Sequence, residues 1–132
     1  DLELFERHGK PVVEEVFWKP EKAVEKIAEH LRVQPDGYET AAVLTMTDQE
    51  AWELAKALKE RLGEDLVTYM NKDSSRFKKG ITVTTFYLAK GLEFDQVFSV
   101  FPQRDQTPLV QQARYIAATR ALHELHVYEL GD

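Results

Sequence analysis

The stretch that decides the fold is AAVLTMTDQEAWELAKALKERLG, residues 41–63. It opens with the apolar run 41–46, which suits a buried strand. Thr47 then stands three residues before Glu50, the spacing of a capping box that starts a helix. Apolar residues follow at helical spacing, and Gly63 ends the helix: Ala51, Leu54, Ala55, Leu58 and Leu62. The stretch therefore predicts a strand followed by a helix.

The same alternation of strand and helix extends in both directions along the chain. Upstream, the pattern predicts a strand over 11–18 and a helix over 21–33 that ends at the Pro35-Asp36-Gly37 turn. Downstream it predicts strands over 66–70, 81–86, 96–101 and 125–130, a polar loop over 71–80, a turn or short helix over 88–94, and a helix from Pro108 to about Leu122. Such alternation is typical of an α/β fold with a mainly parallel sheet and helices on its faces.

Length and composition set limits on the class of protein. The 132 residues suit a single domain over 1–132, and 43% hydrophobic with 30% charged residues is ordinary for a soluble globular protein. No segment has the pattern of a signal peptide or a membrane helix, and the absence of cysteine fits a cytoplasmic protein. His123 and His126 have no evident third ligand, so we expect them on the surface and expect no metal site. We expect Trp18 and Trp52 in the core.

The net charge of −6 argues against autonomous binding of nucleic acid. Proteins that bind DNA on their own are usually basic, because much of the affinity comes from neutralised phosphates. The basic residues are scattered here, apart from the cluster of Arg76, Lys78 and Lys79. We therefore expect at most weak contact with single-stranded DNA by this chain alone.

Two segments carry residues that folding alone does not explain. The first is TTFYLAKGLEFD, residues 84–95, which we expect at the carboxyl ends of the strands, where ligands bind in parallel sheets. It can equally be a well-made turn, with Lys90 and Glu93 in solvent. The second is YIAATRA, residues 115–121, which places Arg120 on the apolar stripe of its helix. Arg120 is either a cation favoured by the helix C-terminus or a guanidinium held toward a phosphate.

Together these segments resemble motifs V and VI of the UvrD/Rep-type superfamily 1 DNA helicases. Motif V of that family has the form T-x-H-x-x-K-G-L-E-F and resembles Thr85–Phe94, and motif VI has the form Y-V-A-x-T-R-A and resembles Tyr115–Ala121. Residues 41–58 also look like the motif IV strand and helix. The resemblance thus covers the chain from about residue 41 to its end.

The resemblance implies the C-terminal RecA-like motor domain of an ATP-dependent helicase. By resemblance, Glu93 contacts the ribose of ATP, Gly91 lies near the phosphates, and Arg120 is the catalytic arginine finger. Thr85, Tyr87 and Lys90 belong to the stretch that couples the ATP site to single-stranded DNA. No G-x-x-x-x-G-K-[ST] loop and no Walker B carboxylate is evident in the sequence. We therefore expect ATP and Mg²⁺ to be bound mainly by the N-terminal RecA-like domain of the same polypeptide, and this chain alone to be inactive.

The chain departs from the family pattern at three places. Tyr87 stands where motif V has histidine, and Thr45, Met46 and Thr47 stand where motif IV is expected to supply an arginine. The large subdomain that UvrD and Rep insert between motifs IV and V is replaced by a short segment, which resembles the helicase IV or HelD-like branch. Some members of that branch act on RNA polymerase. The alternative function is a non-catalytic interaction module that docks on RNA polymerase or on a repair partner; the acidic charge favours it, and the presence of both Glu93 and Arg120 disfavours it.

Overall fold

The computed structural model describes residues 10–33, 37–74, 80–102 and 107–131. They form six strands: β1 (Val13–Phe17), β2 (Thr40–Thr45), β3 (Val67–Tyr69), β4 (Gly80–Thr85), β5 (Phe94–Pro102) and β6 (Ala121–Leu130). The three helices are α1 (Pro20–Arg32), α2 (Asp48–Leu62) and α3 (Pro108–Arg120). Part of the predicted turn after α1 and the cluster of Arg76, Lys78 and Lys79 lie outside the described residues.

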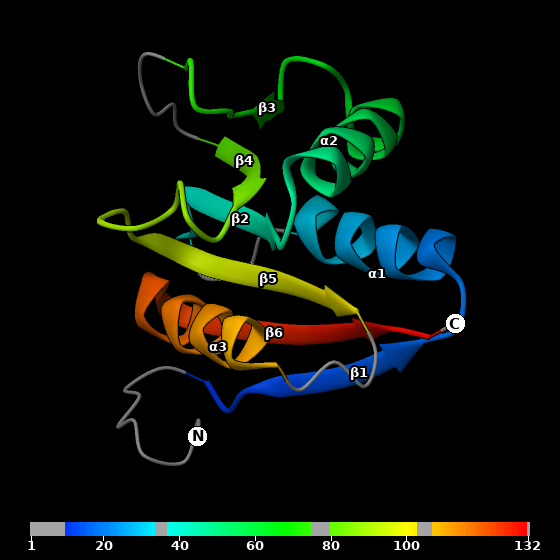
Figure 1. The fold of residues 1–132 in the computed structure, drawn as a ribbon. Helices are drawn as coiled ribbons and strands as arrows, with labels where there is room; N and C mark the ends of the chain where they lie inside the picture. The colour runs from blue at the N-terminus through cyan, green and yellow to red at the C-terminus, as the bar shows by residue number, and fades with distance from the viewer. Residues whose placement is uncertain (1–9, 34–36, 75–79, 103–106, 132) are drawn as a thin grey trace.

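The six strands form one sheet in the order β1-β6-β5-β2-β4-β3, and every pairing among the described strands is parallel. The predicted α/β class with a mainly parallel sheet is therefore confirmed. All strands of a parallel sheet end at the same edge, so the sheet has a carboxyl edge and an amino edge. Figure 1 shows the strand arrows of β2, β5 and β6 pointing the same way, which makes these two edges easy to follow.

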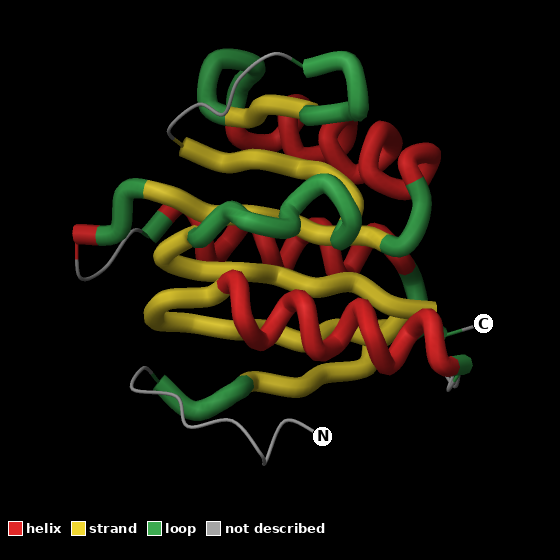
Figure 2. The backbone as a smooth tube through the Cα atoms, turned by 60° about the vertical axis from the view of Figure 1, so that its left-hand side comes forward, coloured by secondary structure: helices red, strands yellow, loops and turns green. Residues whose placement is uncertain are grey.

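Helices cover both faces of the sheet, and the alternation of side chains along β2 shows how. Ala41 and Val43 pack in one hydrophobic cluster with α1 and α2, whereas Ala42 and Leu44 pack in a second cluster with α3. Successive residues of a strand point to opposite faces, so the two clusters lie on opposite sides of the sheet. Figure 2 shows α3 on the near side of the strands and the other helices behind them.

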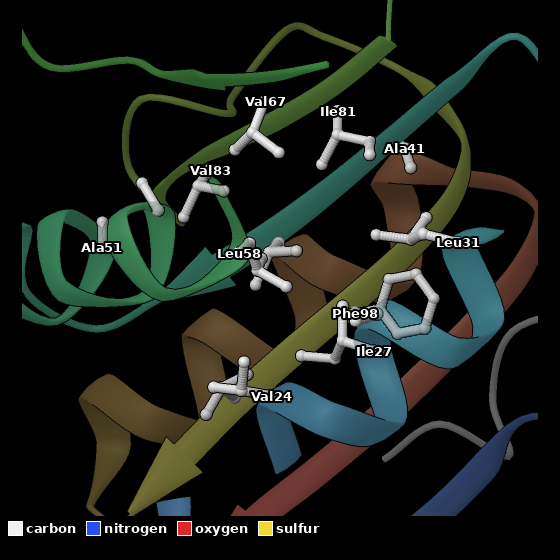
Figure 3. Packing of buried hydrophobic residues seen from close by; sticks show 14 of the residues in the cluster. Val24, Ile27, Leu31, Ala41, Ala51, Leu58, Val67, Ile81, Val83 and Phe98 are labelled. Atoms are coloured by element: carbon white, nitrogen blue, oxygen red, sulfur yellow. The ribbon is translucent and has the colours of Figure 1, made fainter. Parts of the chain in front are cut away.

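The cluster beneath α1 and α2 explains why those two segments are helical. Val24, Ile27 and Leu31 follow one another at helical spacing and are buried against Phe98 of β5 (Figure 3). Burial of each such side chain contributes about 1.5–3 kcal/mol, which is the main reason that a short amphipathic helix persists. From α2, Leu58 enters the same cluster.

The capping box predicted at the start of α2 is confirmed. The Glu50 amide donates to Thr47 Oγ1 at 3.2 Å, and the Thr47 amide donates to Glu50 Oε1 at 2.9 Å. At the other end, Gly63 has a φ of 102°, and its amide donates to the Lys59 carbonyl at 2.9 Å. Both ends of α2 are thus determined by local residues.

The junction between α3 and β6 differs from the prediction. α3 ends at Arg120 and β6 begins at Ala121, whereas the sequence predicted a helix to about Leu122 and a strand only from Leu125. Ala121 pairs with Phe94 of β5, so the parallel ladder draws the chain into the sheet before the helical pattern runs out. For the same reason β5 begins at Phe94, two residues before the predicted start.

Three predictions about burial are wrong. Trp18, which follows edge strand β1, is 63% exposed, and Trp52, on the outer face of α2, is 46% exposed. The ring of Trp52 lies 5.4 Å from Lys56 Nζ, a contact that suits an exposed aromatic side chain. His126, expected on the surface, is only 2% exposed, because β6 lies between β1 and β5 in the sheet and the His126 ring stacks on Phe98. Within the described ranges, no helix is long and apolar enough to cross a membrane.

Candidate functional site

The segment 86–93 joins the carboxyl end of β4 to the amino end of β5. At one end, Thr85 pairs with Thr45, the last residue of β2. At the other end, Phe94 is the first residue of β5. Since β4 and β5 both run parallel to β2, the connecting segment must pass from one edge of the sheet to the other. Figure 1 shows it doing so as the loop between β4 and β5. The expectation that 84–95 lies entirely at the carboxyl edge is therefore wrong for its second half.

Apolar anchors and tight turns hold this crossing segment on the sheet. Phe86 and Ala89 are fully buried in the cluster beneath α3, and the Phe86 ring stacks on Phe101 of β5 with centroids 4.9 Å apart. The Leu88 amide donates to Thr85 Oγ1 at 3.3 Å, and the Leu92 amide donates to the Ala89 carbonyl at 3.0 Å. The segment is a series of turns, one of the two forms that the sequence allowed.

Gly91 allows the last of these turns. Its φ of 84° lies in the left-handed region that residues with a Cβ rarely adopt. The position is exposed, and an added Cβ would meet nothing within 4 Å. The backbone conformation, and not crowding, is therefore the reason for glycine at this point.

The candidates for coupling to DNA begin at the carboxyl edge with Thr85 and continue into the crossing segment. Thr85 ends β4 and is 7% exposed, while the neighbouring Tyr87 is 43% exposed. Lys90 Nζ lies 5.4 Å from the centre of the Tyr87 ring. An aromatic face and a cation are thus presented together.

A cavity of about 460 Å³ opens beside Thr85 at this edge. It is lined by the start of α2, the residues after β3, and the crossing segment: Asp48, Asn71, Lys72, Asp73, Thr85 and Leu88. Asp48 Oδ1 accepts a hydrogen bond from the Tyr69 hydroxyl at 2.6 Å, which raises the pKa of Tyr69. Sequence reasoning did not single out Asp48 or Asn71, because they come from elements that meet Thr85 only in the folded sheet.

The candidates for contact with ATP lie at the opposite, amino edge. Glu93 directly precedes Phe94, and Arg120 directly precedes Ala121, and Phe94 and Ala121 are paired on adjacent strands. Adjacent strands lie about 4.8 Å apart, so the backbones at Glu93 and Arg120 are neighbours. Glu93 is exposed and Arg120 is half-buried. The structure therefore brings together two residues from the two separate motifs.

Arg120 differs from the other arginine of α3 in its partners. The Arg120 Nε donates to Thr119 Oγ1 at 3.2 Å, a contact within the helix end. Arg114 instead forms an ion pair with Glu129 of β6, with Nη2 and Oε1 2.7 Å apart, and its guanidinium lies 4.7 Å from the centre of the Phe101 ring. Arg114 is thus held by the fold itself and offers a matched comparison for Arg120.

Asp95, which the sequence reading did not single out, connects strands at the amino edge. Its Oδ2 accepts the backbone amides of Glu39 at 2.7 Å and Thr40 at 3.0 Å, and its Oδ1 lies 3.7 Å from His123 Nε2. Burial by itself would raise the pKa of Asp95, but the hydrogen bonds from Glu39 and Thr40 outweigh burial and lower the pKa. The carboxylate is therefore held in its charged form.

A second polar group, around His126, lies inside β6. The His126 Nε2 is 3.1 Å from Glu124 Oε1, its Nδ1 is 3.4 Å from the Tyr128 hydroxyl, and its ring stacks on Phe98 with centroids 4.5 Å apart. Burial lowers the pKa of His126, and the hydrogen bond with Glu124 opposes that shift only in part. Both ring nitrogens are thus engaged within the fold, and His126 is not placed to act at the amino edge.

Comparison with known proteins bears on the family and the fold of the chain. Residues 80–128, from β4 to β6, match the family model of the UvrD-like helicase C-terminal domain. Over 94% of its length the chain is similar to the crystal structure of the C-terminal domain of a possible DNA helicase from Lactobacillus plantarum, with 29% sequence identity and a TM-score of 0.76, covering 76% of that chain. No curated protein matches the chain. The fold is thus that of a RecA-like C-terminal helicase domain, and the resemblance drawn from the two motifs is confirmed.

Proposed function

We propose that this chain is the C-terminal motor domain of an ATP-dependent DNA helicase, because residues 80–128 match the family model of the UvrD-like helicase C-terminal domain. In this proposal it completes the ATP site and couples hydrolysis to movement along single-stranded DNA. The proposal rests on one observation. Glu93 and Arg120, from separate motifs, are neighbours at the amino edge, and the segment 86–93 connects this edge to Thr85 at the carboxyl edge.

The amino edge is the proposed contribution to the ATP site. Arg120 would stabilise the negative charge that develops on the transferred γ-phosphoryl group, for which a planar guanidinium is well suited. The Glu93 carboxylate would accept hydrogen bonds from ribose hydroxyls, and the exposed backbone at Gly91 would lie near the phosphates. The N-terminal RecA-like domain of the same polypeptide would bind ATP and Mg²⁺.

The carboxyl edge is the proposed contact with single-stranded DNA. The exposed face of Tyr87 can stack on a base, and Lys90 beside it can meet a backbone phosphate. The Thr85 hydroxyl is already bonded to the Leu88 amide, so Thr85 would act by fixing the start of the crossing segment. A movement of the crossing segment at one edge of the sheet would be transmitted to the other edge through the buried Phe86 and Ala89 side chains.

The direct test is the ATPase activity of the full-length polypeptide, measured with and without single-stranded DNA. We expect DNA to stimulate hydrolysis by the full-length protein, and we expect no hydrolysis by this chain alone, because a phosphate-binding loop is not evident in its sequence. A catalytically inactive full-length protein that binds RNA polymerase or a repair partner through this domain would instead support the interaction module. Turnover by a clean preparation of this chain alone would contradict the proposal.

A further inference from the structure

We propose that Asp95 is a positioning residue for the ATP contacts, fixing Glu93 and Arg120 relative to each other at the amino edge. The inference rests on the proposed function and adds to it a residue that contacts neither nucleotide nor DNA. Asp95 follows Glu93 by two residues, and its partner His123 follows Arg120 by three. The Asp95 carboxylate is thus close in sequence to Glu93 and, through its partner His123, to Arg120.

Asp95 is bonded to the start of β2 and to the residue before it. Asp95 Oδ2 accepts the Glu39 and Thr40 amides at 2.7 and 3.0 Å, and it also accepts the Thr40 hydroxyl at 3.3 Å. In return, the Asp95 amide donates to Thr40 Oγ1 at 2.9 Å. The pairing of β2 with β5 starts only at Ala41 and Gln96, so these bonds extend the junction beyond the end of the ladder.

The contact with β6 joins the third strand. Asp95 Oδ1 lies 3.7 Å from His123 Nε2, and the His123 ring stacks on Tyr38 with centroids 5.5 Å apart and planes within 2° of parallel. The starts of β2, β5 and β6 therefore meet at one side chain. Phe94 stands between Asp95 and Glu93 in the sequence and is fully buried. The backbone next to Glu93 is therefore held both by the buried Phe94 side chain and by the bonds of Asp95.

A local irregularity of β6 lies opposite Asp95. The register of β5 against β6 shifts between Phe94 and Gln96, as in a β-bulge, and two β6 residues, Leu122 and His123, face Asp95 alone. Such irregularities give up regular ladder bonds and are over-represented next to active sites, where they redirect a side chain. The irregularity follows directly after the Phe94–Ala121 pair, whose members are the neighbours of Glu93 and Arg120 in the sequence.

The experiment compares Asp95→Asn with wild type in the full-length protein, using ATP and 2′,3′-dideoxy-ATP as alternative substrates. The amide keeps the size of the side chain but loses the charge and half of its acceptor capacity. We expect the KM for ATP to rise about five- to tenfold with a smaller fall in kcat, since a displaced Glu93 loses binding to the ribose. We also expect the preference for ATP over the dideoxy analogue to shrink.

The matched control is Glu129→Gln, which removes the partly buried ion pair with Arg114 at the other end of β6. It should lower the melting temperature while leaving KM and the preference for ATP unchanged. If Asp95→Asn does not fold, Thr40→Val removes the two hydroxyl bonds and keeps the carboxylate, and it should raise KM by a smaller factor.

Two failures are distinguishable. A folded Asp95→Asn or Thr40→Val protein with the KM and ATP preference of wild type would overturn the role of Asp95 and leave the proposed function standing. A full-length wild-type protein without DNA-stimulated ATPase activity would overturn the proposed function, and the role of Asp95 with it.

Discussion

At the scale of single residues, Tyr87 tests the assignment of the carboxyl edge to DNA. The family pattern has histidine at this position, and both residues present an aromatic face. We expect Tyr87→Ala in the full-length protein to weaken binding of single-stranded DNA by about 1–3 kcal/mol, the usual value of one stacked base, while Tyr87→His retains most of the affinity. Fluorescence anisotropy at fixed salt is the measurement. Equal losses in the two variants would show that the phenolic hydroxyl matters and the ring face does not.

At the scale of an element, β6 carries a predictable dependence of stability on pH. Burial lowers the pKa of His126 below its ordinary value of 6.5, so the folded chain binds fewer protons there than the unfolded chain. The stabilisation is therefore complete above pH 6.5 and is lost as the pH falls through the lowered pKa of the folded state. We expect denaturant unfolding to show this loss in wild type and a shallower dependence in His126→Gln.

Val97→Ala is the control for that series. Val97 is buried on the face of β5 covered by α3, away from His126, and its side chain does not titrate. It should lower stability by a similar amount at every pH. If His126→Gln retained the full pH dependence of wild type, another group would have to be its cause.

The elements also show how far the sequence could determine the fold. The start and end of α2 were predictable because the capping box and Gly63 act through residues a few positions away. The junction of α3 and β6 was not, because it depends on the pairing of Ala121 with Phe94. The motifs identified Glu93 and Arg120, but their placement at the amino edge follows only from strand order. Asp95 could not be identified from the sequence, because its hydrogen-bond partner Thr40 is far away in the sequence.

At the scale of the whole molecule, the net charge of −6 limits what this chain can bind alone. We expect weak and salt-sensitive binding of single-stranded DNA by the isolated chain, since few cations are available to replace counterions. Anisotropy titrations at low and moderate salt would check this. Submicromolar affinity that persists at moderate salt would reveal a DNA site beyond Tyr87 and Lys90.

The central claim, that this domain completes an ATP site, depends most directly on Arg120. An arginine finger acts mainly in the transition state and can contribute roughly 10³-fold or more to the rate. Arg120→Ala and Arg120→Lys should therefore both abolish most DNA-stimulated turnover in the full-length protein, because lysine keeps the charge but loses the planar fork. Nucleotide binding should fall much less than turnover.

The decisive measurement is kcat together with the nucleotide Kd for Arg120→Lys, beside a thermal melt and the control Arg114→Lys. Arg114 is already paired with Glu129, so its variant should lose stability and retain turnover. We predict a folded Arg120→Lys protein with near-normal nucleotide binding and a kcat reduced by about 10³-fold. A folded Arg120→Lys protein with turnover close to wild type would contradict this prediction.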